Sequence, residues 1–201
     1  MKNTQIYKTG IQEAKKIGNS NTKMTEVGSA KYFLWGSEKS EQSIVIKIGR
    51  VFERMVLTEI KSSKRFQLGT IGVQKISGQK TKKDVDLMFI DKQTKTIYYR
   101  ELKANIDLDT EKLPATTDKI KIIEQHLKAQ HKGYSIDSGI LCMPVYSKEA
   151  LGDRLQKKVD MYNKSNVKVQ FANDLFTILG LSITEAEWEN FGLEMGQILR
   201  S

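Results

Sequence analysis

The sequence predicts an α/β fold in which helices flank a central mixed β-sheet. Three patterns support this prediction. Apolar residues recur at steps of three and four between positions 42 and 62, which is typical of an amphipathic helix. Two apolar runs, 85–90 and 96–102, flank a polar connection and predict a β-hairpin. The nearly continuous apolar run 136–145 favours a strand that is buried on both faces of its sheet.

Together with the remaining elements, these segments give the predicted order helix, three antiparallel strands, helix, strand, helix, strand and further helices. The first strand is expected within 66–76. A helix is expected to start near Pro114, and its apolar stripe contains Ile120 and Ile123. Another helix is expected over 151–162, and a short strand over 167–171.

The C-terminal part of the chain carries two helix-start signals. Asn173 or Asp174 is expected to cap a helix that runs to Gly180. Thr184 and Glu187 form a capping-box pattern, which predicts the start of the last helix.

The composition limits the kind of protein. A chain of 201 residues fits a single domain, 1–201, with a substantial core. The one cysteine, Cys142, suits a reducing environment, and no apolar run is long enough to cross a bilayer. No signal peptide is visible, so we expect a cytoplasmic protein without membrane contact. The net charge of +9 and the pI of about 9.4 are typical of proteins that neutralise phosphates.

The predicted hairpin carries charged residues at its open end. Asp84 and Asp86 begin the first strand, while Glu101 and Lys103 close the second. Because side chains alternate along a strand, Glu101 and Lys103 share one face. A turn at 92–95 brings the two ends together, so we expect a cluster of two carboxylates and one ammonium group.

Such a cluster suits a hard divalent cation. Mg²⁺ prefers oxygen ligands, usually one or two carboxylates together with water and phosphate. A neighbouring lysine would activate a water molecule or stabilise charge that develops on a phosphate. We prefer Asp86 and Glu101 as the ligands because Asp86 directly precedes the apolar run; Asp84 remains an alternative. The competing interpretation is an exposed strand with a weak surface ion pair.

The spacing of an aspartate, an apolar strand and Glu101-x-Lys103 resembles the PD-(D/E)xK nuclease superfamily. The resemblance covers about 41–171 and implies a restriction endonuclease-like core and Mg²⁺-dependent hydrolysis of DNA. No proline precedes either aspartate, which departs from the full motif. The run GRVFERMV is similar to the first core helix of many members, in which a glutamate points at the metal. This makes Glu53 a candidate additional ligand or catalytic residue. The alternative is a glutamate paired with Arg50 or Arg54.

Candidate DNA contacts lie next to the motif. The loop before Asp84 contains Lys80, Lys82 and Lys83, which suit phosphate contacts. Asn105 follows the second hairpin strand and is expected at the rim of the site. Lysines at 119, 121 and 128 are expected on the outer face of a helix, which we interpret as a solvated face, with a DNA-flanking face as the alternative.

Within the superfamily, we expect a type II restriction endonuclease that cleaves double-stranded DNA at a specific sequence. Many such enzymes are homodimers, because two active sites related by a two-fold axis can cut both strands. One alternative is a resolvase or repair nuclease with the same chemistry. A DNA-binding protein without catalysis is the other.

Overall fold

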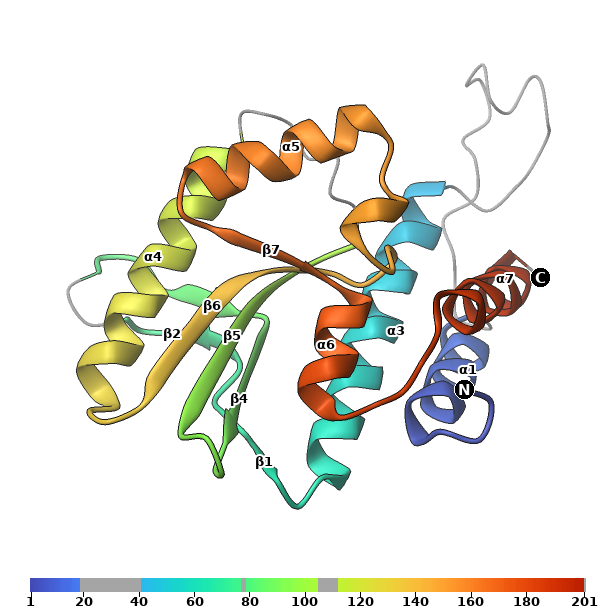
Figure 1. Ribbon diagram of the computed structural model, residues 1–201, viewed down its shortest axis with the longest axis horizontal. Helices are drawn as coiled ribbons and strands as arrows, with labels where there is room; N and C mark the ends of the chain where they lie inside the picture. The colour runs from blue at the N-terminus through green and yellow to red at the C-terminus, as the bar shows by residue number, and fades with distance from the viewer. Residues whose placement is uncertain (19–40, 77–78, 105–111, 201) are drawn as a thin grey trace. The chain divides into compact units, whose positions relative to one another are not determined.

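The computed structural model describes residues 1–18, 41–76, 79–104 and 112–200 (Figure 1). These residues form two compact units. The first unit consists of Met1–Val56 and Thr184–Ser201, and the second of Leu57–Ile183. Helix α3 (Glu41–Ser62) contributes residues to both units.

A mixed five-stranded β-sheet is the centre of the second unit. Its strands are β1 (Phe66–Leu68), β4 (Leu87–Asp91), β5 (Thr96–Lys103), β6 (Ser135–Cys142) and β7 (Lys168–Phe171). They lie in the order β1-β4-β5-β6-β7. The pairs β1–β4 and β4–β5 are antiparallel, and the pairs β5–β6 and β6–β7 are parallel. The predicted α/β fold with a mixed sheet is therefore confirmed.

Helices connect the parallel strands. α4 (Lys112–Gln130) joins β5 to β6, and α5 (Asp153–Lys164) joins β6 to β7 after the short 3₁₀ helix η1 (Lys148–Ala150). α4 and α5 lie on the same side of the sheet (Figure 1). α6 (Ala172–Leu179) follows β7.

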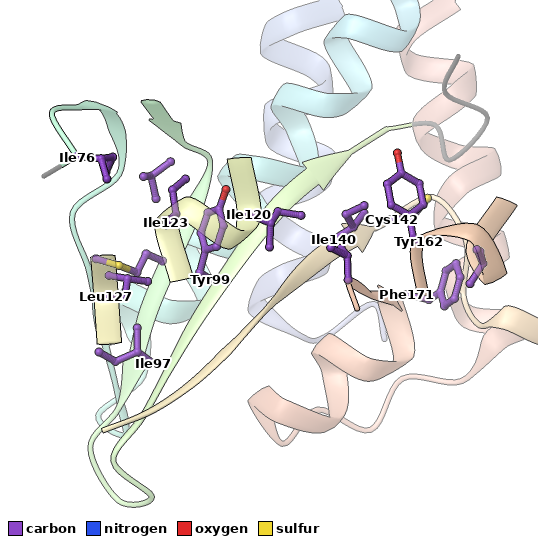
Figure 2. Close-up of a cluster of buried hydrophobic side chains, with 14 of the residues drawn as sticks. Ile76, Ile97, Tyr99, Ile120, Ile123, Leu127, Ile140, Cys142, Tyr162 and Phe171 are labelled. Carbon is purple, nitrogen blue, oxygen red and sulfur yellow. The ribbon is translucent and has the colours of Figure 1, made fainter. Parts of the chain in front are cut away.

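The main core of this unit lies between the sheet and α4 and α5 (Figure 2). On β5, Ile97 and Tyr99 are fully buried, and they lie in the same cluster as Ile120 and Ile123 of α4. These isoleucines belong to the apolar stripe that the sequence predicts for this helix. Burial of each such side chain stabilises the fold by about 1.5–3 kcal/mol. The core thus fixes α4 over the face of β5 to which Tyr99 points.

The predicted hairpin is confirmed. β4 pairs with β5, and Asp91 lies opposite Thr96. The carboxylate of Asp91 accepts a hydrogen bond from the backbone N–H of Gln93 at 2.9 Å, and Arg65 forms an ion pair with the same side chain. Lys95 closes the turn with a positive φ of 53°. Asp91 is therefore the turn residue that shapes this end of the hairpin.

The strands before the hairpin differ from the prediction. The segment 66–76 forms two short strands in different sheets, because β2 (Gly72–Gln74) turns away to pair with β3 (Lys83–Val85). β4 pairs with β1 instead. Asp86 lies at the break between β3 and β4. The change of pairing partner produces this break, which local periodicity does not reveal.

The start of α6 is also different. Neither Asn173 nor Asp174 is its N-cap, because the helix begins directly after β7 with Phe171 at that position. Asp174 instead accepts a hydrogen bond from the backbone N–H of Phe171 at 2.8 Å. Gly180 ends the helix with a positive φ of 72°, where the sequence places the helix end.

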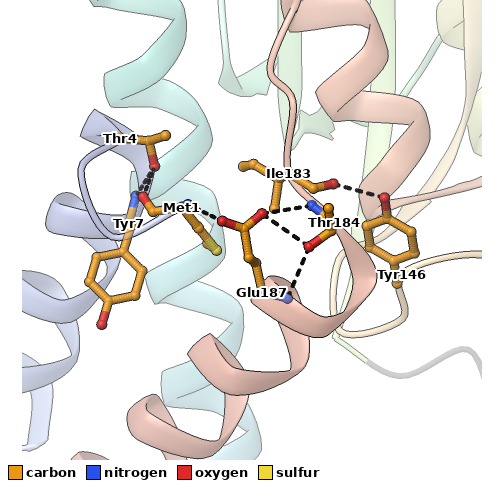
Figure 3. A network of polar contacts seen from close by, with 7 residues as sticks. All are labelled: Met1, Thr4, Tyr7, Tyr146, Ile183, Thr184 and Glu187. Carbon is orange, nitrogen blue, oxygen red and sulfur yellow. Dashed lines mark hydrogen bonds and ion pairs between the residues drawn. The ribbon is translucent and has the colours of Figure 1, made fainter.

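The first unit is helical. α1 (Gln5–Gly18) packs against α7 (Glu185–Arg200), and Phe191 of α7 lies in ring contact with Tyr7 and Trp188. The predicted capping box is present, because Thr184 and Glu187 exchange backbone and side-chain hydrogen bonds (Figure 3). Among the described helices, none is both long and apolar enough to span a membrane.

Candidate functional site

The candidate site is formed at the end of β5. Glu101 and Lys103 are two residues apart on this strand, and their side chains meet: Lys103 Nζ lies 2.8 Å from Glu101 Oε1. Only 7% of the Glu101 side chain is exposed. A carboxylate is rarely buried to this extent without a specific role or partner.

Asp86 joins this pair from the neighbouring chain segment. Its Oδ2 accepts a hydrogen bond from the backbone N–H of Leu102 at 2.9 Å. The side chain of Asp86 is half-buried, whereas Asp84 on β3 is exposed. Of the two candidate aspartates, Asp86 therefore makes the contact to the Glu101 strand.

A second lysine completes the cluster. Lys119 of α4 reaches both carboxylates: its Nζ lies 2.5 Å from Glu101 Oε2 and 3.4 Å from Asp86 Oδ1. Its side chain is 19% exposed, like that of Lys103. The site thus contains two carboxylates and two ammonium groups, and we call Asp86, Glu101, Lys103 and Lys119 the charged cluster.

A buried tyrosine of the core contacts Glu101. Tyr99 lies two residues earlier on the same face of β5, and its hydroxyl donates a hydrogen bond to Glu101 Oε2 at 3.3 Å. Burial raises the pKa of the Tyr99 phenol, and the nearby charges of Glu101 and Asp86 raise it further. Tyr99 is therefore a neutral donor that holds the Glu101 carboxylate.

The two carboxylates have opposite pKa shifts. Burial raises the pKa of Asp86 to about 6, and the negative charge of Glu101 adds to this effect, although Lys119 partly opposes it. Burial also acts to raise the pKa of Glu101, but Lys103 and Lys119 outweigh burial and lower it. Titratable groups with pKa values separated by their environment are typical of functional sites.

The opposite face of β5 carries a buried arginine. Arg100 is 1% exposed, and its guanidinium donates to the carbonyl oxygens of Tyr99, at 2.9 Å, and Asp137. It also forms an ion pair with the Asp137 carboxylate on β6 at 3.0 Å. These contacts tie β5 to β6 directly behind the charged cluster, so the cluster is built on a rigid part of the sheet.

The other predicted residues do not enter this cluster through any contact in the described part of the chain. Lys80 and Lys82 are exposed, and Lys83 begins β3 half-buried. Asn105 lies outside the described residues. Glu53 lies on α3 in the first unit, whereas the charged cluster belongs to the second, so its role as an additional ligand stays a prediction.

The prediction of an outer face for Lys119 is wrong. Lys121 and Lys128 are exposed as expected, but Lys119 points to the carboxylates. Position 119 precedes Ile123 by four residues, so it lies at the border of the buried stripe. This helical spacing was the available signal, but it does not reveal that α4 packs over Glu101.

The charged cluster contains oxygen donors of the kind that hold a divalent cation. Its donors are carboxylate oxygens, and Asp86 and Glu101 converge on one position, because Lys119 Nζ contacts both. In the described residues, no group of three or more His, Cys, Asp or Glu side chains is placed to hold a metal ion. Mg²⁺ nevertheless needs only one or two carboxylates when water and substrate phosphate supply the remaining ligands.

Comparison with known proteins adds no assignment. No protein-family model matches the chain, and no curated protein sequence matches it.

Proposed function

We propose that this protein is a Mg²⁺-dependent DNA endonuclease whose active site is the charged cluster. The observation that carries the proposal is the convergence of Asp86 and Glu101 beside Lys103 on a strand that is fixed by the core. This arrangement agrees with the resemblance of the hairpin sequence to the PD-(D/E)xK motif. The net charge of +9 supports a polyanionic substrate.

Each residue has a chemical role in this proposal. Asp86 and Glu101 hold the cation through their carboxylate oxygens, and Tyr99 and the Leu102 N–H keep these carboxylates in place. When bound there, Mg²⁺ would supply Lewis-acid stabilisation of the phosphate. Lys103 orients the attacking water and stabilises negative charge that develops on the phosphate. Lys80, Lys82 and Lys83 remain candidate contacts to the DNA backbone.

Within this chemistry, we favour a type II restriction endonuclease that acts as a homodimer on double-stranded DNA. In the described residues, one unit is a mixed sheet with its flanking helices and the other is helical, and a sheet with flanking helices suits such a subunit. A resolvase or repair nuclease would use the same residues on branched DNA. A DNA-binding protein without catalysis would not need buried carboxylates at the end of β5.

The test is cleavage of a long, unmethylated linear duplex in the presence of Mg²⁺ or of EDTA. We expect discrete fragments with Mg²⁺ and an intact duplex with EDTA. Lys103→Ala should lower the cleavage rate by at least about 100-fold, as removal of a charge-stabilising group typically does. Lys157→Ala is the matched control, because Lys157 is exposed on α5 and has no role in the proposed site, and it should cleave like the wild type.

The same assay distinguishes the alternatives. Cleavage of four-way junctions but not of linear DNA would favour the resolvase. Binding of DNA without cleavage of either substrate, and equal binding by Glu101→Gln, would refute the enzymatic proposal. If Asp84→Asn abolished cleavage and Asp86→Asn did not, the assignment of the aspartate would be wrong.

A further inference from the structure

Lys119 occupies the position between the two carboxylates. Of the four carboxylate oxygens, Asp86 Oδ2 accepts the Leu102 N–H at 2.9 Å, and Glu101 Oε1 contacts Lys103 Nζ at 2.8 Å. The two other oxygens, Asp86 Oδ1 and Glu101 Oε2, both contact Lys119 Nζ. Lys119 therefore joins the pair of oxygens that face a common point.

An ammonium group and a divalent cation cannot share those two oxygens at contact distance, because like charges at a few ångströms repel strongly. Lysine is suited to leave such a position. Its charge is carried on a flexible four-carbon stem, while its backbone stays fixed in α4 by the buried stripe of Ile120 and Ile123.

We propose that Lys119 is a displaceable internal cation of the active site. It holds Asp86 and Glu101 together when no divalent cation is bound. It gives up their oxygens when the cation binds, and it then contacts the phosphate of the substrate. This inference rests on the proposed nuclease function and assigns a second lysine, in addition to Lys103, to the phosphate side of the site.

The charge balance of the cluster favours this sequence of events. Two carboxylates and two ammonium groups sum to zero, so the cluster is neutral without a divalent cation. With a divalent cation, the same four side chains carry an excess charge of about +2, which favours an anion at the same place. DNA phosphate and the cation should therefore bind cooperatively, and each should raise the affinity of the other by the same factor.

The test measures separately how Lys119 affects the binding of the cation and the binding of DNA. Binding of Mn²⁺ alone is measured by calorimetry for the wild type, Lys119→Met and the control Lys157→Met, in which the substituted lysine is exposed on α5. Lys119→Met should bind Mn²⁺ roughly ten-fold more tightly, because a competing positive charge is gone. Binding of a short duplex with Ca²⁺ in place of Mg²⁺ should instead weaken roughly ten-fold, since one phosphate contact is lost. Lys157→Met should change neither affinity.

Each outcome has a distinct meaning. Equal or weaker Mn²⁺ binding by Lys119→Met, or unchanged DNA binding, would overturn the role of Lys119 and leave the nuclease proposal intact. If the wild type bound no Mn²⁺, or if Glu101→Gln bound it as tightly as the wild type, both the role of Lys119 and the nuclease proposal would be overturned. If Lys119→Met does not fold, as judged by circular dichroism, Lys119→Gln takes its place with the same expected shifts.

Discussion

Asp91 allows a quantitative test of the hairpin that carries the site. The Asp91→Asn change keeps the size of the side chain but removes its charge. In the structure, Asp91 is fully buried at the base of the turn, and its Oδ2 lies 3.0 Å from Arg65 Nε. The hydrogen bonds from Arg65 lower the pKa of Asp91 from 3.8 to about 2, although burial opposes them.

The expected magnitude follows from this pKa. A decrease from 3.8 to about 2 corresponds to about 2.4 kcal/mol of folding free energy at neutral pH. Because the Arg65 side chain is 37% exposed, solvent screens the interaction, and we expect Asp91→Asn to cost about 1–2 kcal/mol. With an ordinary urea slope, this is a decrease of roughly 0.5–1 M in the unfolding midpoint.

The effect has a defined pH dependence. The folded-state pKa is lowered, so the stabilisation is complete above the unfolded pKa of about 4 and disappears as the pH falls towards about 2. The difference between wild type and Asp91→Asn in urea unfolding should thus be constant from pH 5 to 7 and about half as large at pH 3.

A matched control is available in the same unit. Asp160 forms an ion pair with Lys148 at 3.0 Å, and both side chains are largely exposed, at 52% and 43%. Asp160→Asn should change stability by less than about 0.5 kcal/mol. Equal effects of the two substitutions, or an Asp91→Asn effect that does not shrink at pH 3, would show that the buried Asp91–Arg65 pair does not stabilise the fold in this way.

Three further substitutions test the packing of the first unit and one hydrogen bond in the second. Gly10→Ala in α1 would place a Cβ 2.5 Å from Cζ of Phe191, so we expect a loss of about 1–3 kcal/mol in urea unfolding. Gly192→Ala in α7 meets no heavy atom of the described residues within 4 Å and should instead stabilise the protein by up to about 1 kcal/mol; a loss of similar size at both glycines would contradict this packing. Tyr99→Phe removes the hydrogen bond to Glu101 and should cost about 1 kcal/mol; an unchanged midpoint would show that this bond contributes nothing to stability.

The sequence was informative where local rules determine structure. Alternation along β5 placed Glu101 and Lys103 on one face, and the polar segment between two apolar runs identified the turn after Asp91. These features depend on neighbours in the chain, and the structure bears them out. The helix periodicity of α3 likewise predicted its limits to within one residue.

The rest depends on contacts between distant segments. The break at Asp86 arises because β3 and β4 pair with different strands. The position of Lys119 depends on how α4 packs over β5, and a long side chain at the border of a stripe can point either to solvent or to the site. The spacing of residues along the chain therefore predicts neither the break at Asp86 nor the position of Lys119.

In the proposed mechanism, Asp86 and Glu101 hold a divalent cation. The most direct measurement is anomalous diffraction from crystals soaked with Mn²⁺, which marks the position of the metal. We predict a peak between the two carboxylates, with the Lys119 ammonium displaced from Glu101 Oε2. A peak elsewhere, or no peak with Lys119 still in contact with both carboxylates, would show that these carboxylates do not hold the cation.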